Sequence, residues 1–151
     1  MPPFSYSFPV RFDDVDHAGI VYYPRFLHFF HTAFEEFFRQ RVGGSAFVDL
    51  LNRRRIGFPA VHAECDYRVP IRFGDLVRVD MSVERLGAKS IRFRHRLYLV
   101  EEAAAPGKGG VPELCAEGVV VVVVTDLAHF RGLEIPGDVR QLFLELCGDT
   151  E

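Results

Sequence analysis

Three aspartates that precede an aromatic-rich segment are the first residues of the chain whose types and spacing could do chemistry. Asp13, Asp14 and Asp16 lie within four residues, in an acidic stretch that ends at Gly19. Carboxylates that repel one another beside apolar side chains can lose hydration, and a partly desolvated carboxylate acts as a base or nucleophile. A helix beginning just after them would offer free backbone N–H groups, which suit a polarised carbonyl or a developing oxyanion. The pattern favours a hydrolase of an activated acyl group.

A structural role for the same acids stays open. Aspartates that precede a helix commonly cap its first turn or complement its dipole, and one of the three could do only that.

Other catalytic motifs fail on their spacing. The segment GGSAF at 43–47 lacks the second glycine of a nucleophile elbow, and GKGG at 107–110 is neither a P-loop nor a dinucleotide fingerprint. We interpret the latter as a flexible hairpin loop.

Metal-binding spacings are equally weak, and we expect no metal site. His62 and Cys65 stand three residues apart in a predicted strand without companion ligands, while His28 and His31, one helical turn apart, lack a matching carboxylate pattern. The three cysteines, an odd number, are expected to be buried structural thiols: Cys65, Cys115 and Cys147.

The element that must position the aspartates is a long helix. Pro24 suits a first helical turn, where its missing N–H costs nothing, and the pair Gly43–Gly44 suits the end. About 17 residues would span roughly 26 Å. Apolar residues recur at helical spacing in an unusually wide stripe, so we expect the helix to be largely buried. They are Phe26, Leu27, Phe29, Phe30, Ala33, Phe34, Phe37 and Phe38.

Strands flank this helix in the sequence. Alternation predicts a strand over 4–12. After a short helix and polar loop at 45–58, further strands are predicted at 60–69, 75–86, 90–101, 113–125 and 130–134. One helix followed by a run of strands indicates the α+β class. We expect a single domain, residues 1–151, with a five- to six-stranded antiparallel sheet wrapped around the long central helix.

Composition narrows the functional classes. The chain is 48% apolar with a net charge of -3, which excludes a disordered chain and offers no footprint for nucleic acid. The longest apolar run, Val119–Val124, is too short to span a bilayer and fits an interior strand covered on both faces. No secretory leader is evident, so we expect a cytoplasmic protein. The valine run needs more cover than one helix supplies, which favours a homodimer, or a homotetramer.

Several segments together resemble a known family. FDDVDHAGIVYYPRFLHFF is similar to the signature of the hotdog-fold acyl-CoA thioesterases, above all the 4-hydroxybenzoyl-CoA thioesterase branch. The resemblance continues through FPAVHAECDYRVPIRFGDLVRV, ERLGAKSIRFRH and FRGLEIPGDV, and so spans most of the chain. It implies a hotdog fold and an enzyme that splits an acyl-CoA into free acid and coenzyme A, with coenzyme A as part of the substrate and no separate cofactor.

The resemblance also implies roles for individual residues. Asp16 matches the catalytic carboxylate, which acts either as nucleophile or as general base on water. The backbone amide of Tyr23 matches the donor to the thioester carbonyl, and Gly19 lets the chain turn tightly beneath the substrate. The residues that match coenzyme A contacts are Lys89, Ser90 and Arg131.

The expected substrate contacts are His17, Tyr22 and His31, and here the sequence departs from the branch. At the position of His31 the 4-hydroxybenzoyl enzyme has an aspartate that meets the ring hydroxyl, and at Tyr22 it has a tryptophan. A histidine could still hydrogen-bond a polar ring substituent. An aromatic acyl group therefore remains the expectation, and a short or medium aliphatic one the alternative.

Two other functions stay open. A hotdog hydratase or dehydratase would use a histidine with an acid, and His17 adjoins Asp16, although the spacing does not match. A non-catalytic acyl-CoA or lipid-binding module would keep the fold without needing Asp16.

Overall fold

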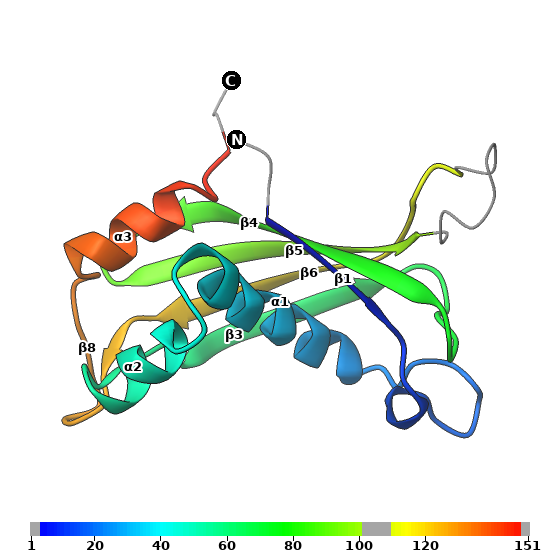
Figure 1. Ribbon diagram of the computed structural model, residues 1–151, viewed down its shortest axis with the longest axis horizontal. Coiled ribbons are helices and arrows are strands. Elements are labelled where there is room, and N and C mark those ends of the chain that lie inside the picture. Colours follow the sequence, from blue (N-terminus) through cyan, green and yellow to red (C-terminus); the bar gives the residue numbers. More distant parts are fainter. Residues whose placement is uncertain (1–3, 101–109, 149–151) are drawn as a thin grey trace.

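The computed structural model describes residues 4–100 and 110–148. Its longer elements are a leading strand, a long helix and four further strands (Figure 1). In chain order the elements are β1 (Phe4–Pro9), the 3-10 helix η1 (Phe12–Asp14), α1 (Arg25–Arg41), α2 (Ala46–Asn52), β2 (Ile56–Gly57), β3 (Ala60–Tyr67), β4 (Leu76–Leu86), β5 (Ser90–Val100), β6 (Glu113–Val123), β7 (Thr125–Asp126), β8 (Arg131–Gly132) and α3 (Gly137–Leu144).

One antiparallel sheet forms the main layer and curls around α1 (Figure 1). Its five strands run in the order β1-β4-β5-β6-β3, and β4, β5 and β6 each have 11 residues. At about 3.3 Å per residue these strands are roughly 36 Å long, enough to cover the whole helix. The expected α+β arrangement, a long helix wrapped by an antiparallel sheet, is confirmed.

Helix α1 has the boundaries that its sequence predicts. Pro24 is its N-cap, Arg41 its last residue, and its 17 residues match the expected length. The phenylalanine stripe faces the sheet: Phe34 meets Phe93 of β5 with ring centroids 5.5 Å apart. The stripe is buried because the sheet curves over it. The buried residues are Phe26, Phe29, Phe30, Ala33, Phe34, Phe37 and Phe38.

The valine run lies in an interior strand, as predicted. Strand β6 pairs with β5 on one side and β3 on the other. Val120 and Val122 line a cavity beside α1. Val119 and Val121 are the register partners of Arg94 and Arg92, so they share the outer face with charged side chains.

Four short elements differ from the expectation. Strands β2, β7 and β8 form a separate three-stranded sheet, and β8 replaces the longer strand predicted at 130–134. Helix α3 was not predicted; it packs through Val139 and Phe143. The first strand ends at Pro9 rather than at residue 12, because the 3-10 helix η1 begins at Phe12. The predicted hairpin loop GKGG at 107–110 falls, apart from residue 110, outside the described residues.

Strand β3 is an exposed edge. Within the described residues it pairs with β6 alone, and seven of its eight residues are exposed. An edge strand presents unpaired N–H and C=O groups to any strand that can align with it.

Candidate active site

Asp16 lies in a tight loop between β1 and α1. Its backbone N–H donates to the carbonyl of Ile20 at 3.0 Å, and its own carbonyl accepts from Gly19 at 3.0 Å. Gly19 has φ +81°, a left-handed backbone conformation that favours glycine. One carboxylate oxygen, Oδ1, accepts the N–H of Ala18 at 2.8 Å. The other accepts no hydrogen bond within residues 4–100 and 110–148, so it is free to act on a substrate.

The buried carboxylate of the acidic cluster is Asp14, not Asp16. Asp14 is 6% exposed, whereas Asp16 is exposed. Asp14 accepts from Arg25 Nε at 2.7 Å, and Asp13 accepts from the same guanidinium at 3.1 Å. The alternative that one of these aspartates caps the helix does not apply to α1, because Pro24 is its N-cap and no side chain caps it. Asp13 and Asp14 instead neutralise an arginine in the first turn.

The start of α1 offers one unpaired amide. Tyr22 donates its N–H to the carbonyl of Asp14 at 2.9 Å, and Pro24 has no N–H. Between them, the N–H of Tyr23 makes no hydrogen bond to any part of the chain that the structure describes. Its side chain is 65% exposed, and Tyr22 is 50% exposed. An N–H group without a partner at the start of a helix can donate a hydrogen bond to the carbonyl oxygen of a ligand.

Tyr67, a residue that the sequence analysis did not single out, holds the backbone at Tyr23 in place. Its hydroxyl donates to the carbonyl of Tyr23 at 2.7 Å, and its ring meets Phe26 edge-on at 4.9 Å. Burial and the nearby Cys65 raise the pKa of Tyr67 to about 12, so the hydroxyl remains a donor. The contact ties edge strand β3 to the first turn of α1.

A cavity of about 500 Å³ lies between α1, α2 and the sheet. Its walls are almost wholly apolar, apart from two histidines, His31 and His95. His31 is half exposed, and its Nε2 lies 2.8 Å from Glu35 Oε1. The remaining lining residues are Leu27, Phe30, Phe34, Phe47, Leu51, Phe58, Ala60, Ala63, Phe93, Val120 and Val122. The arrangement can hold an apolar group and meet a polar substituent on it.

The predicted coenzyme A contacts gather at one end of the sheet. Val124 donates its N–H to the carbonyl of Lys89 at 2.7 Å, and Ser90 is the register partner of Val123. Arg131 lies in β8, which pairs with β7 immediately after β6. Lys89 and Arg131 are exposed and Ser90 is half-buried, so the three can face a ligand together.

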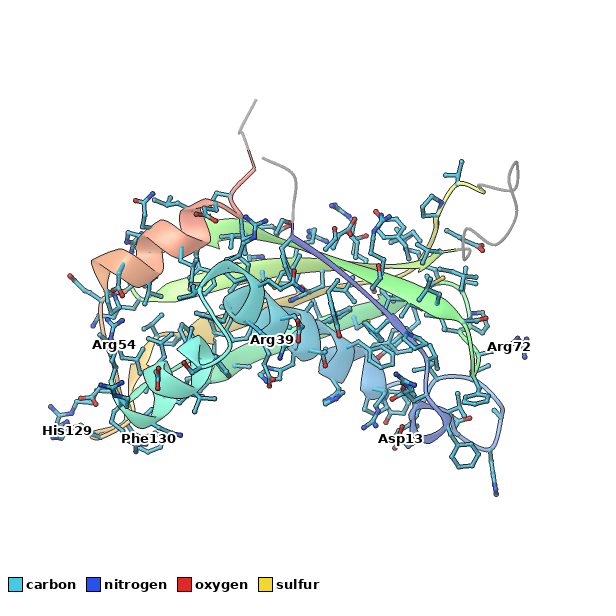
Figure 2. The ribbon with its side chains drawn as sticks, viewed as in Figure 1. Asp13, Arg39, Arg54, Arg72, His129 and Phe130 are labelled. Atoms are coloured by element: carbon cyan, nitrogen blue, oxygen red, sulfur yellow. The ribbon has the colours of Figure 1, made fainter. Side chains whose placement is uncertain are left out.

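The two halves of the predicted site lie at opposite ends of a single chain. Asp13, three residues from Asp16, is at one end of the molecule, and Phe130, next to Arg131, is at the other (Figure 2). His17 and Tyr22 lie on the exposed loop with Asp16. His31 lies apart from them, in the cavity wall. The loop before α1 therefore carries Asp16, His17, Gly19, Tyr22 and Tyr23, whereas the Lys89 carbonyl lies against Val124, between β6 and β7.

The remaining candidates behave as structural groups. Of the three cysteines expected to be buried, Cys115 is buried, whereas Cys65 and Cys147 are only partly buried. Burial raises the pKa of all three thiols, which favours their protonated form. Among residues 4–100 and 110–148, no group of three or more His, Cys, Asp or Glu side chains could hold a metal ion. Over the same residues, no helix has the length and apolar character to cross a membrane.

Comparisons with known proteins agree with this geometry. The family model of the thioesterase-like superfamily matches residues 10–143. The acyl-CoA thioesterase YbgC of Haemophilus influenzae is 28% identical over 94% of this chain and 96% of its own. The 1,4-dihydroxy-2-naphthoyl-CoA hydrolase of Synechococcus sp. (strain CC9605) is 33% identical over 70% of this chain and 73% of its own.

A solved structure extends the likeness to three dimensions. The BH1999 gentisyl-coenzyme A thioesterase superposes with a TM-score of 0.71 at 29% identity, covering 93% of this chain and 98% of its own. The expected class of reaction, hydrolysis of an acyl-CoA thioester, is confirmed at the level of the family. The chain belongs to the thioesterase-like superfamily and has its hotdog fold.

Proposed function

We propose that this protein hydrolyses the CoA thioester of an aromatic acid that carries a ring hydroxyl group. The observation that carries the proposal is the 500 Å³ cavity, whose apolar walls contain two histidines. An aromatic ring suits the phenylalanine lining, and a histidine suits a polar ring substituent. Relatives of the chain are named for 1,4-dihydroxy-2-naphthoyl-CoA and gentisyl-CoA, which supports the hydroxyaryl class without singling out 4-hydroxybenzoyl-CoA within it.

In this proposal the reaction uses two groups at the start of α1. The thioester carbonyl accepts the free N–H of Tyr23, which stabilises the oxyanion that forms as the carbonyl is attacked. The free oxygen of Asp16 then follows one of two routes. It attacks the carbonyl carbon and forms a mixed anhydride that water opens, or it takes a proton from the water that attacks. Both routes release the coenzyme A thiolate, which takes up a proton.

A homodimer completes the site. Strand β3 is an unpaired edge within the described residues, and antiparallel pairing with β3 of a second copy places the Tyr67 end of one subunit beside the Ala60 end of the other. That pairing brings Asp16 of one subunit to the cavity of its partner. Lys89, Ser90 and Arg131 then bind the phosphates and nucleotide of coenzyme A. The assembly of two dimers into a tetramer stays a prediction.

The test of the reaction is thiol release from a panel of aryl- and alkyl-CoA esters. Hydroxyaryl esters should be hydrolysed fastest. Asp16→Asn should lose at least about 100-fold in kcat because the reacting carboxylate is gone. Asp13→Asn, an exposed acid of the same loop, is the matched control and should retain activity. Full turnover in Asp16→Asn would overturn the assignment, and a preference for alkyl esters would overturn the acyl class.

Subunit mixing tests the shared site. Asp16→Asn and Leu51→Trp, which fills the cavity, should each be inactive alone. If each site takes Asp16 from one subunit and its cavity from the other, half of a mixed population is hybrid and carries one intact site. About a quarter of the wild-type activity should then return on mixing. A site contained within one chain would return none.

A further inference from the structure

A second polar group lies in the cavity wall, deeper than His31. The imidazole of His95 is 2% exposed, and neither Nδ1 nor Nε2 has a hydrogen-bond partner within the described residues. It belongs to the inward-facing row of β5, between the buried side chains of Phe93 and Leu97. Buried polar atoms in folded proteins nearly always have partners, so two unpaired nitrogens in one ring require a reason.

The His95 ring packs against a phenylalanine of α1 in the cavity wall. The His95 ring stacks on Phe30 with centroids 4.7 Å apart and planes 9° apart. Phe30 reaches this position because residue 118, the register partner of His95, is glycine. A Cβ at Gly118 would lie 2.5 Å from the Phe30 ring and 2.7 Å from the backbone oxygen of Glu64. The stack, and with it the place of the imidazole in the wall, depends on that glycine.

The protonation state of the His95 ring determines which kind of substituent can pair with it. Burial lowers the pKa of His95 to about 3, so the ring is neutral near pH 7. A neutral imidazole presents one N–H donor and one acceptor nitrogen. A hydroxyl group, which both donates and accepts, matches that pair of functions. A carboxylate would use only the N–H donor, would leave the acceptor nitrogen unpaired, and would itself be a buried charge.

His31 is less suited to this role. It already has Glu35 as a partner, and its side chain is half exposed at the edge of the cavity. A polar substituent that binds His31 competes for its imidazole with the Glu35 carboxylate and with water. A hydroxyl that reaches His95 meets a group with no competing partner in the described chain.

We propose that His95 is a specificity-determining residue that hydrogen-bonds a ring hydroxyl of the acyl group inside this cavity. The inference rests on the proposed thioesterase function and narrows it from an acyl class to one substituent. The nitrogens are reached when the imidazole turns about its Cβ–Cγ bond and exchanges the stack on Phe30 for the hydrogen bond. Such contacts commonly tighten only when the substrate is bound.

The experiment compares two esters that differ in ring hydroxyls, 1,4-dihydroxy-2-naphthoyl-CoA and 2-naphthoyl-CoA. The measured quantity is the ratio of their kcat/KM values. In His95→Phe the ratio should fall on the order of 10- to 100-fold, because the hydroxyl is buried without a partner. His95→Gln, which still donates and accepts, should recover much of it. Phe93→Leu alters the neighbouring wall without removing a polar group and should shift both esters alike.

Three outcomes overturn the inference: an unchanged ratio in His95→Phe, an equal fall in Phe93→Leu, or no recovery in His95→Gln. Calorimetric binding of the same two esters to Asp16→Asn, with and without His95→Phe, gives the preference without turnover. Absence of thiol release with a retained binding preference would therefore refute the proposed reaction and leave the role of His95 standing. Turnover of both esters with an unchanged kcat/KM ratio in His95→Phe would refute the role of His95 and leave the proposed reaction standing.

Discussion

The buried imidazole of His95 should make the empty protein sensitive to acid. Burial lowers its pKa from 6.5 to about 3 in the folded protein. In the unfolded chain the ring takes up a proton near pH 6.5, whereas in the folded chain it does so only near pH 3. The unfolded state therefore binds more protons in this window. The contribution of His95 to the free energy of unfolding is complete above pH 6.5 and is lost as the pH falls toward 3.

The size of the effect follows from the same two values. Each pKa unit corresponds to about 1.4 kcal/mol, so lowering the pH from 7 to 4 should remove about 3 kcal/mol of stability through this ring. For a chain of this size 1 kcal/mol shifts Tm by about 2–4 °C. Wild type should thus lose about 6–12 °C more than a variant without the imidazole.

The assay is thermal unfolding followed by circular dichroism from pH 7 to pH 4, at one protein concentration, for wild type and His95→Phe. Glu84 and Glu117 add acid sensitivity of their own: although burial opposes it, hydrogen bonds from Arg94 lower the pKa of both. That part is common to both proteins and cancels in the difference. His28→Ala removes an exposed histidine of α1 and should follow the wild type. Parallel Tm curves for wild type and His95→Phe would refute the reasoning.

Three further substitutions test neighbouring contacts. Tyr67→Phe removes the hydrogen bond to the Tyr23 carbonyl and should lower kcat roughly tenfold with a smaller change in KM, in steady-state thiol release; a change confined to KM would contradict a positioning role. His31→Ala should reduce hydrolysis of hydroxyaryl-CoA more than that of an unsubstituted or alkyl ester, and equal losses across the panel would make His31 structural. Gly118→Ala should destabilise the protein by about 1–3 kcal/mol, measured by denaturant unfolding, because its Cβ meets Phe30 and a backbone oxygen that cannot move aside; an unchanged midpoint would show that the strands can separate there.

The parts of the fold that the sequence predicts are those with a long periodic signal. Helix α1 is predictable because its phenylalanines repeat over four turns and its ends carry Pro24 and a glycine pair. The long strands are predictable because each alternates or is continuously apolar between turn residues. In both cases the pattern arises because one face of the element is buried, the helix against the sheet and the sheet against the helix.

The elements that the sequence does not predict depend on distant partners. Strands β2, β7 and β8 have two residues each, too few for any periodicity, and exist because residues 56–57 lie beside 125–126 in the fold. Helix α3 buries only Val139 and Phe143. One buried pair at i and i+4 is too short a repeat to separate a helix from a loop.

At the proposed site, sequence reasoning points to the loop and to His31 in the cavity wall, and it misses Tyr67 and His95. Asp16, Gly19 and Tyr23 follow from one contiguous motif, whereas the hydroxyl of Tyr67 reaches Tyr23 across 44 residues of sequence. For His95 a local signal did exist. In SIRFRHRLYLV the inward positions are Ile91, Phe93, His95 and Leu97, so a polar ring interrupts an otherwise apolar row. A break of that kind within a buried face is the pattern to look for.

Several groups at the proposed site lack a partner within the described residues, among them one oxygen of Asp16, the Tyr23 N–H, the nitrogens of His95 and the free edge of β3. A leucine at position 95 would remove two unsatisfied atoms, and the empty protein would be more stable for it. The imidazole is therefore a cost in stability that only a bound ligand can offset. In the proposed function an oxyanion would complete the Tyr23 amide, and a second copy would complete the edge of β3. Under that proposal, the unpaired groups match a thioester carbonyl, a ring hydroxyl and another copy of the chain.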